Sequence, residues 1–396
     1  MTRATRVSIV GGGLGGLTAA LALLKKGFDV TVFEQARELG EIGAGIQLAP
    51  NAMKVLMGLG LEKQVLRTAF EPEAHVVRNW KTGTATATTQ MKGVYHDQFG
   101  AGYYTFHRAD LHEALVEAMP AERVRLNVKC TGVRNQGNVA ILDFADGTQV
   151  ESDVVIGADG IHSVIRETLF GPQPPRFTGV VCWRGLVPAD ALPAGTVTPD
   201  MTAWFGPRST IVTYYVRGGQ LVNWAAFFEQ DWRQESWRIE GDKQEVLSTY
   251  ENWHPSINQL VSKTDRLYKW AVFDREPLAQ WTKGRVTLLG DSAHPMLPYL
   301  AQGACMAVED GYALAMALER NPQNVELALQ AYEAERRPRT SRVQLASRAR
   351  ARVNHLESPL AGLRRDIGYA IKKFFNPSKH TYGVEWIYGH DVTVNR

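Results

Sequence analysis

A glycine-rich run near the N-terminus has the spacing of a dinucleotide-binding turn. The run is Gly11-Gly12-Gly13-Leu14-Gly15-Gly16, and Glu34 follows at the end of the next apolar segment. Gly11 permits a tight turn, Gly13 lets the backbone approach a pyrophosphate, and Gly16 lets a helix pack closely on a strand. The N–H groups of a helix starting here attract phosphates, and Glu34 can accept hydrogen bonds from a ribose. The run predicts a site for FAD or NAD; a plain glycine turn is the alternative.

The segments around this run predict one βαβ unit. Val7–Val10 and Val30–Phe33 are rich in β-branched residues and indicate buried parallel strands. Between them, Leu17, Leu21 and Leu24 recur at helical spacing. The glycine run is therefore expected at the turn from strand to helix, where a dinucleotide binds.

The composition is that of an ordinary globular protein. The chain has 396 residues, enough for two or more interleaved domains, and its net charge of +3 gives no reason to expect a nucleic-acid partner. Cys130, Cys182 and Cys305 have no CxxC spacing, so neither a disulfide framework nor a metal site is expected. The chain shows no signal-peptide layout and no apolar run of the roughly 20 residues that a membrane span needs, so we expect a cytoplasmic protein.

The remaining sequence predicts helices and strands that alternate and then change in character. A helix is expected over Pro50–Leu66, broken near Gly58 and Gly60. Asp110 resembles the start of a capping box for a helix that ends at Met119. A β-hairpin is expected over residues 139–150, and a buried strand over 153–156.

Strand patterns dominate between about residues 178 and 230. Their apolar stretches are Val180–Trp183, Met201–Phe205, Thr210–Val216 and Leu221–Phe228. They predict a mostly antiparallel second sheet inserted into the first domain. The expected divisions are residues 1–177 and 271–345 for the dinucleotide domain, 178–270 for the second sheet, and 346–396 for a C-terminal helical segment.

The C-terminal third predicts a strand at Arg285–Leu289, a helix over Gln302–Leu318, and further helix from Val325 onward. Three arginines, at positions 336, 337 and 339, surround Pro338. They have the charge to bind an anion, but we favour a solvated helix face or a subunit contact.

Three motifs in order resemble a known family. They are the glycine run with Glu34, Gly157-Ala158-Asp159-Gly160, and Gly290-Asp291-Ser292-Ala293-His294-Pro295. Together they resemble the single-component flavoprotein aromatic hydroxylases, which include salicylate hydroxylase, 3-hydroxybenzoate 6-hydroxylase and 6-hydroxynicotinate 3-monooxygenase. The resemblance implies an α/β fold like that of para-hydroxybenzoate hydroxylase: a Rossmann-like FAD-binding domain, an inserted antiparallel substrate domain and C-terminal helices.

The resemblance also implies cofactor contacts. Asp291 would bind the ribityl chain of FAD, although a simple helix N-cap is the alternative for it. Gln302-Gly303-Ala304 would place N–H groups near the flavin N1/O2 edge, and Arg108 would contact the cofactor. Asp159 lies in a motif that the family uses for both FAD and reduced nicotinamide.

The implied chemistry uses NADH or NADPH to reduce the flavin, and molecular oxygen then adds at its C4a carbon. The hydroperoxide transfers OH⁺ to an electron-rich ring, so the site must exclude water and help a phenol lose its proton. No second GxGxxG run is present, in keeping with transient nicotinamide docking.

The resemblance places Tyr214 near the substrate oxygen, and we take Tyr214 and His294 as the catalytic candidates. Gln47, Tyr214, Pro298 and Tyr299 are the expected substrate contacts, and Tyr215 should point to the opposite face of its strand. Simple packing is the alternative for Tyr214, and a purely structural role is the alternative for His294.

This pocket departs from two of the resembling groups. The 6-hydroxynicotinate enzymes have histidines at the positions of Gln47, Thr210 and Tyr299. The 3-hydroxybenzoate enzymes have a histidine at Thr210 and a glutamine at Pro298. The substrate, its hydroxylated position and any decarboxylation stay open.

The leading hypothesis is an NAD(P)H-dependent monooxygenase of a small aromatic acid, as a monomer or homodimer. A reductase or halogenase of the same fold is a second hypothesis, although the halogenase Trp-x-Trp-x-Ile-Pro stretch is not found. A non-catalytic binding module is a third, but such a module would lose the motifs retained at Asp159, Asp291 and Gln302.

Overall fold

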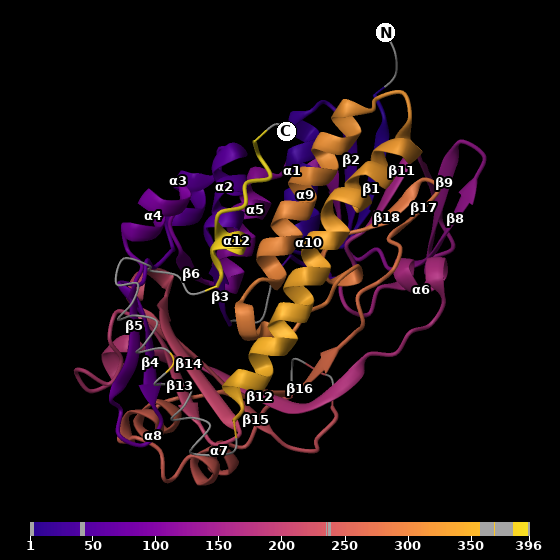
Figure 1. Cartoon of the computed structure of the whole chain (residues 1–396). Coiled ribbons are helices and arrows are strands. Elements are labelled where there is room, and N and C mark those ends of the chain that lie inside the picture. Colours follow the sequence, from indigo (N-terminus) through magenta and orange to yellow (C-terminus); the bar gives the residue numbers. More distant parts are fainter. Residues whose placement is uncertain are drawn as a thin grey trace.

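The computed structural model describes residues 4–39, 44–234, 236, 239–356, 368 and 383–394. Its first sheet, in the upper half of Figure 1, has the strand order β17-β18-β11-β1-β2-β7. The strands are β1 (Arg6–Val10), β2 (Asp29–Phe33), β7 (Val124–Arg125), β11 (Val154–Gly157), β17 (Thr282–Lys283) and β18 (Val286–Leu288). All neighbours pair in parallel except β17 and β18, so the predicted βαβ unit is confirmed.

Helices cover this sheet on the side where α9 and α10 run across it in Figure 1. The main helices are α1 (Leu14–Lys25), α5 (Arg108–Ala118), α9 (Gly303–Arg320) and α10 (Val325–Asn354). Helix α1 packs on α9, and α9 packs on α10. Residues Val7 to Val10 of β1 are all buried, as expected for a strand inside a parallel sheet.

The second sheet is larger than the sequence indicates, with the order β16-β12-β15-β14-β13-β4-β5. Its strands are β4 (Ala74–Asn79), β5 (Ala85–Gln90), β12 (Arg176–Pro188), β13 (Met201–Gly206), β14 (Ser209–Val216), β15 (Leu221–Glu229) and β16 (Leu267–Asp274). The strands expected between residues 178 and 230 are all present. The hairpin β4–β5 joins from the first part of the chain, through parallel pairing of β4 with β13.

The expected domain boundaries each fall inside an element. Residue 177 lies in β12, residue 270 in β16 and residue 345 in α10. Strands β12 and β16 and helix α10 therefore run across the expected boundaries, although each strand belongs to one sheet only.

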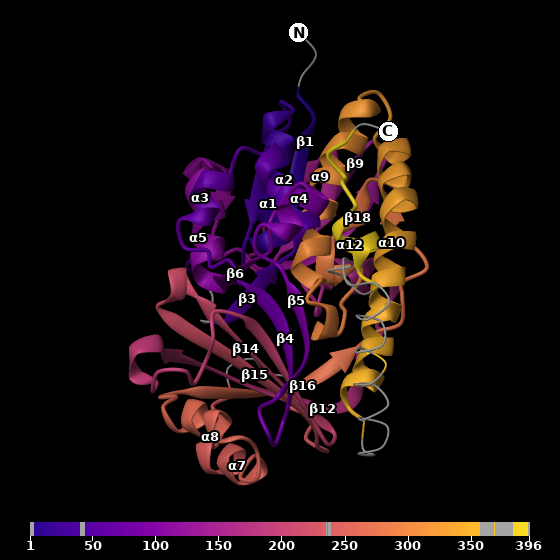
Figure 2. The same cartoon turned by 60° about the vertical axis from the view of Figure 1, so that its left-hand side comes forward.

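One face of the second sheet is covered by α7 (Lys243–Thr249) and α8 (Pro255–Ser262), below the sheet in Figure 2. An apolar cluster fills the space between these two helices and the sheet, and it includes Trp183, Trp224, Tyr250 and Trp253. The tryptophans of this region are thus mainly core residues, as expected. The other face of the sheet is directed towards the first sheet and the loops that follow its strands.

Shorter elements complete the fold. They are β3 (Gly45–Leu48), β6 (Tyr104–His107), β8 (Cys130–Gln136), β9 (Val139–Phe144), β10 (Gln149–Ser152), α2 (Pro50–Gly58), α3 (Glu62–Leu66), α4 (Val94–Phe99), α6 (Val164–Phe170) and α12 (Glu385–Tyr388). The hairpin of β9 and β10 and the break between α2 and α3 were both expected.

The expected capping box at Asp110 is wrong. Helix α5 begins two residues earlier, at Arg108, and His107 is its N-cap. Asp110 lies inside the first turn, where it pairs with Arg217 and accepts a hydrogen bond from that side chain. The sequence spacing predicted that the Asp110 carboxylate would cap the helix, but in the structure it forms an ion pair with the distant Arg217 instead.

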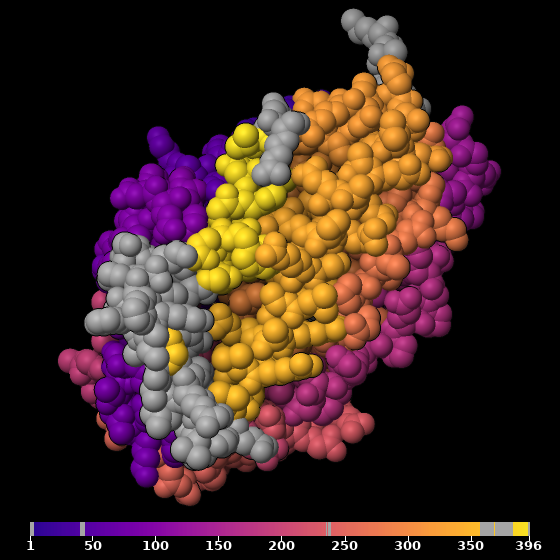
Figure 3. All heavy atoms as spheres, in the orientation of Figure 1, coloured from indigo at the N-terminus to yellow at the C-terminus, as the bar shows by residue number. Residues whose placement is uncertain are grey.

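The C-terminal segment from Gly383 to Val394 lies on the surface beside α9 and α10, shown in yellow in Figure 3. Arg339 donates to the carbonyl oxygens of Trp386 and Ile387 at 3.2 and 3.0 Å. Most of the helical segment expected after residue 346 lies outside the described residues. No helix in the described ranges is long and apolar enough to cross a bilayer.

Buried charges join α9 to α10. Arg336 lies 2.7 Å from both Glu309 and Asp310, and all three side chains are fully buried. Arg339 lies 2.7 Å from Glu309. The expected solvated face is therefore wrong for Arg336 and Arg339, because the carboxylates that neutralise them come from a neighbouring helix. Only Arg337, which is 41% exposed, is close to that expectation.

Replacing Arg336 with methionine should lower the free energy of unfolding by about 3–5 kcal/mol, because two buried carboxylates lose their shared cation. Urea-induced unfolding measures the loss. The matched control is Arg337→Met, whose exposed pair with Glu333 at 3.6 Å should cost less than about 1 kcal/mol. Equal losses in the two variants would contradict the assignment.

Acid should also reveal this network. Burial acts to raise the pKa of Glu309, but Arg336 and Arg339 lower it to about 2. An unfolded glutamate has a pKa of about 4.3, so the folded state loses stability as the pH falls from that value towards 2. Glu309→Gln should be less stable at neutral pH and lose less further stability across this window. Thermal unfolding across a pH series measures both; wild-type acid sensitivity in the variant would refute the prediction.

Candidate active site

The glycine run forms the turn from β1 to α1, as its spacing predicted. Gly11 has φ of +110°, and a Cβ there would lie 2.3 Å from the carbonyl oxygen of Ala158. A Cβ on Gly16 would lie 2.1 Å from the carbonyl oxygen of Gly11. Gly13 has no atom within 4 Å of a Cβ position, so open space lies beside the first turn of α1. The loop has the shape that a pyrophosphate requires.

Glu34 lies at the end of β2, next to this turn. Its carboxylate accepts hydrogen bonds from the backbone N–H of Gly12 and from that of Ala36, both at 2.8 Å. The side chain therefore connects the end of β2 to the glycine loop. The expected contact with a ribose stays a prediction.

A cavity of about 320 Å³ lies between the two sheets. Its wall brings together Arg108 from α5, Asp291 from the turn after β18, and Gln302 with Gly303 and Ala304 from the start of α9. These residues come from distant parts of the chain, and all of them were expected to contact the cofactor. The structure thus brings the residues that were expected to contact the flavin into the wall of one cavity.

Asp291 points its carboxylate into this cavity. The side chain is accessible from the cavity, and none of the hydrogen bonds among the described residues ends on its carboxylate. Surrounding protein raises the pKa of Asp291, although nearby His294 and Arg108 act to lower it. The N-cap of the following long helix is Gln302, so Asp291 is not the helix cap of the alternative interpretation.

The N-terminus of α9 faces the same cavity. The first turn has neither a side-chain cap nor an acidic residue, so its N–H groups and the positive end of the helix dipole are directed at whatever occupies the space. Gln302 is held in place, because its Oε1 accepts a hydrogen bond from Asn51 at 3.1 Å. Asn51 also donates to Glu309 at 2.6 Å, which connects this turn to the buried charges.

A second cavity of about 200 Å³ adjoins the first. Gln47, Val212, Phe227, Pro298 and Ala301 line both. The second cavity is otherwise surrounded mainly by apolar and aromatic side chains, as small-molecule sites usually are.

Strand β14 supplies one wall of this pair of cavities. Thr210, Val212 and Tyr214 face them, since side chains alternate along a strand. Tyr215 points to the other face, where its hydroxyl donates to the carbonyl oxygen of Val197. The expected orientations of the two tyrosines are both confirmed.

Tyr214 and Gln47 form a short polar chain at the junction. Burial raises the pKa of Tyr214 to about 12, and Gln47 acts to lower it. Gln47 also accepts a hydrogen bond from the hydroxyl of Tyr103 at 2.5 Å. At neutral pH Tyr214 is therefore a neutral phenol, which can both donate and accept a hydrogen bond.

His294 does not reach either cavity, in contrast to its expected catalytic position. Its Nε2 lies 2.5 Å from Asp310, and its ring packs against Trp281 at 5.2 Å. The side chain is 2% exposed. The proline that follows, Pro295, lines the larger cavity instead.

Asp159 is also directed away from the cavities. It accepts hydrogen bonds from the hydroxyl of Ser163 at 2.5 Å and from the N–H of Ile165 at 3.2 Å. Its carboxylate thus stabilises the start of α6. The backbone of Ala158 and Asp159 packs against Gly11, so this motif contacts the glycine turn through its main chain.

Several lining residues were not foreseen from the sequence. Arg184 lies over the ring of Trp270 at 4.6 Å and acts to lower the pKa of Tyr214. His75, Arg350 and Asn354 line the smaller cavity. His75 comes from the hairpin that joins the second sheet, and the other two from the far end of α10. Nothing in their local sequence marks them, because strand pairing and helix length bring them here.

Comparison with known proteins agrees with this geometry. Residues 4–347 match the family model described as an FAD binding domain. The chain is 40% identical over 365 residues to a 3-amino-4-hydroxybenzoate 2-monooxygenase of Streptomyces platensis, covering 92% of each chain. It is 38% identical over 363 residues to a 6-hydroxynicotinate 3-monooxygenase of Pseudomonas fluorescens, covering 91% of this chain and 94% of that one.

Among solved structures, a salicylate hydroxylase in complex with its substrate aligns with a TM-score of 0.82 and 27% identity. The alignment covers 99% of this chain and 97% of the other. The fold expected from the three motifs is therefore confirmed over almost the whole chain. With its glycine turn, its gathered cofactor cavity and a match that spans most of its length, the chain belongs to the FAD binding domain family.

Proposed function

We propose that this protein is an FAD-dependent monooxygenase that consumes NADH or NADPH and hydroxylates a small aromatic carboxylate. The observation that carries the proposal is the joining of two cavities, one with a cofactor wall and one with an aromatic wall, through Gln47, Pro298 and Ala301. The names of the two relatives, which specify ring hydroxylation of a hydroxylated benzoate and a hydroxylated nicotinate, support the same substrate class.

The residues present fit FAD. The open space at Gly13 would take the pyrophosphate, Glu34 the ribose, and Asp291 the ribityl hydroxyls, for which its carboxylate has free lone pairs. The N–H groups of Gly303 and Ala304 would stabilise negative charge on the reduced isoalloxazine ring. When bound, FAD supplies the redox chemistry, taking a hydride from NAD(P)H and activating molecular oxygen for transfer to the ring.

The chain's own residues prepare the aromatic substrate. The apolar walls exclude water, which protects a reactive oxygen species from side reactions. Neutral Tyr214 holds the ring oxygen by a hydrogen bond, and Gln47 holds Tyr214 in turn. Because the pKa of Tyr214 is raised to about 12, it acts through this hydrogen bond and a relay rather than as an ionised base.

The cytoplasm is the proposed location. The three cysteines are all buried and free, and burial raises the pKa of each thiol. Such thiols are unreactive, which suits a protein that works in a reducing compartment.

Gly13→Val should abolish FAD binding without unfolding the protein. The added side chain fills the space meant for the pyrophosphate, but the N-cap φ of −75° is one that valine adopts without strain. Flavin absorbance per protein should fall by more than about tenfold, the loss of one charge-assisted contact or more. The matched control is Gly132→Val on β8, where the nearest atoms to the added Cβ are 4.0 Å away, so the new side chain is also accommodated. A yellow, FAD-saturated Gly13→Val protein would exclude this placement.

The activity itself is tested by NADH and NADPH oxidation with 3-hydroxybenzoate, salicylate, 6-hydroxynicotinate and 3-amino-4-hydroxybenzoate. Hydrogen peroxide must be measured alongside, because oxidation with stoichiometric peroxide marks a compound that only triggers flavin reduction. At least one acid should yield a hydroxylated product. Failure of the holoenzyme to hydroxylate any aromatic acid would overturn the proposal.

Tyr214→Phe should lower product per NAD(P)H oxidised by about tenfold to a hundredfold, the loss expected for a hydrogen bond to a developing phenolate. FAD content should stay at the wild-type level. Tyr215→Phe is the matched control on the opposite face of β14 and should leave the product yield unchanged. Equal losses of product and FAD in Tyr214→Phe would make the residue structural.

A further inference from the structure

One charged side chain, that of Arg350, lines the smaller cavity among the described residues. Among the described residues that line it, Arg350 alone carries a formal charge; the others are apolar, aromatic or neutral polar. A positive charge in such surroundings interacts strongly with an anion, because few water molecules screen it. Arg350 is therefore the described lining residue whose charge matches the negative group of a ligand.

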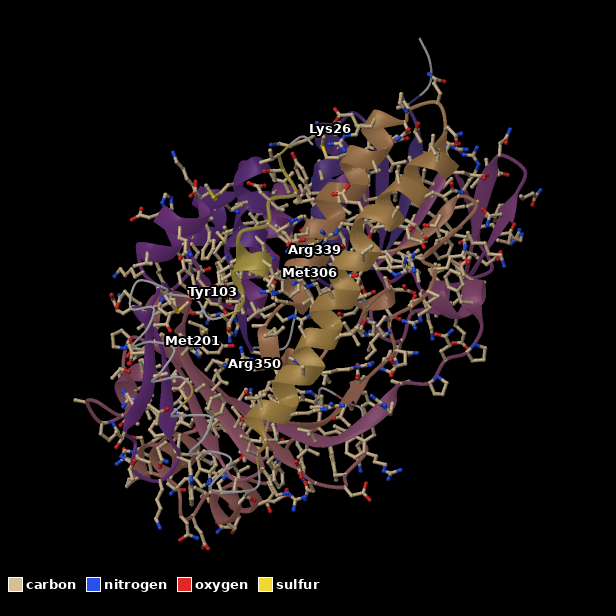
Figure 4. The ribbon with its side chains drawn as sticks, viewed as in Figure 1. Lys26, Tyr103, Met201, Met306, Arg339 and Arg350 are labelled. Atoms are coloured by element: carbon tan, nitrogen blue, oxygen red, sulfur yellow. The ribbon has the colours of Figure 1, made fainter. Side chains whose placement is uncertain are left out.

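Arg350 faces the opposite wall across the cavity. Figure 4 labels it on α10 together with Met201 and Tyr103, which line the same space from other elements. On that wall, His75 of β4 is paired in register with Met201 of β13. Burial and, to a smaller extent, the charge of Arg350 together lower the pKa of His75 to about 4. His75 is therefore neutral near pH 7, and Arg350 is the source of positive charge here.

The position of Arg350 relative to the cofactor is also defined. Arg350 and His75 line the smaller cavity but not the cofactor cavity, whereas Gln47, Pro298 and Ala301 line both. An anion bound at Arg350 thus lies on the side away from the cofactor. The rest of a small aromatic ligand then extends towards the shared wall and Tyr214.

Unsatisfied polar atoms lie near this charge. Asn354 is one helical turn beyond Arg350 and so lies on the same face of α10. Its Oδ1 and the hydroxyl of Tyr299 are buried without a hydrogen-bond partner among the described residues. Thr210, the neighbouring polar residue of β14, already donates to the carbonyl oxygen of Asn354. Buried polar atoms without partners in a cavity indicate a ligand with hydroxyl or amino groups.

We propose that Arg350 binds the carboxylate of the aromatic substrate and so decides which ring position faces the cofactor. Asn354 and Tyr299 complete the recognition of the ring's polar substituents. The inference rests on the proposed function, since it assigns a group of that substrate to a residue. Arg350 acts by positioning and takes no part in oxygen transfer.

The test compares each acid with its neutral carboxamide, which has nearly the same shape but no charge. The probes are 3-hydroxybenzoate, 6-hydroxynicotinate and 3-amino-4-hydroxybenzoate with their amides, titrated into the FAD-loaded enzyme and followed by the change in flavin absorbance. The wild type should bind at least one acid about tenfold or more tightly than its amide. In Arg350→Met the Kd of that acid should rise by about tenfold to a hundredfold, with little change for the amide.

Matched variants separate charge recognition from folding. Arg352→Met removes the same charge from an exposed position on the same helix and should leave both Kd values unchanged. Arg350→Lys should restore part of the preference for the acid. FAD content and thermal unfolding report whether each variant is folded, and Arg350→Gln replaces Arg350→Met if the latter loses FAD.

Two outcomes overturn the inference in different ways. A wild-type preference for the acid in Arg350→Met or Arg350→Gln refutes the role of Arg350, while hydroxylation of the acid by the wild type leaves the proposed function standing. If the FAD-loaded wild type neither binds nor hydroxylates any of the acids, the proposed function fails, and the role of Arg350 fails with it.

Discussion

The burial of Arg336 with Glu309 and Asp310 is the constraint on which the arrangement of the site depends. The three charges are fully buried, and such charges are stable only when each has its partners. Helices α9 and α10 must therefore dock in a single register. Asp310 also accepts a hydrogen bond from the N–H of Gly290 at 3.2 Å, and this fixes the turn that carries Asp291. One network of buried charges thus fixes the positions of both the turn after β18, which carries Asp291, and the helix α9, whose first turn faces the larger cavity.

The network continues towards both ends of the site. Through Asn51 it reaches Gln302, the residue that starts α9. Through Arg339 it holds the carbonyl oxygens of the C-terminal segment, which contributes Tyr388 to the wall of the smaller cavity. The walls of the larger and the smaller cavity are consequently connected through Glu309 and its partners. A substitution in this network of buried charges should therefore change the geometry of both cavities.

The two cavities differ in what builds them. The cofactor wall relies on backbone groups: the glycine turn and the N–H groups at the start of α9. Backbone geometry tolerates changes in the surrounding side chains, and this accounts for relatives that share the family while their names specify different rings. The cavity walls also include side chains, such as Tyr214 in the larger cavity and Arg350 and His75 in the smaller one. Each can change without altering the fold, so ring specificity can diverge while the redox chemistry is kept.

The sequence by itself determined the parts that depend on local spacing: the βαβ unit with Gly11 to Gly16, the alternation that puts Tyr214 and Tyr215 on opposite faces of their strand, and the turns that carry Asp291 and Gln302. Only the tertiary structure decided that His294 forms a hydrogen bond with Asp310, that Arg336 is buried, and that Arg350 lines the smaller cavity. The physical reason is distance along the chain. Residue spacing specifies which neighbours a side chain has within its own helix or strand, whereas burial and ionic partners depend on elements contributed from far away.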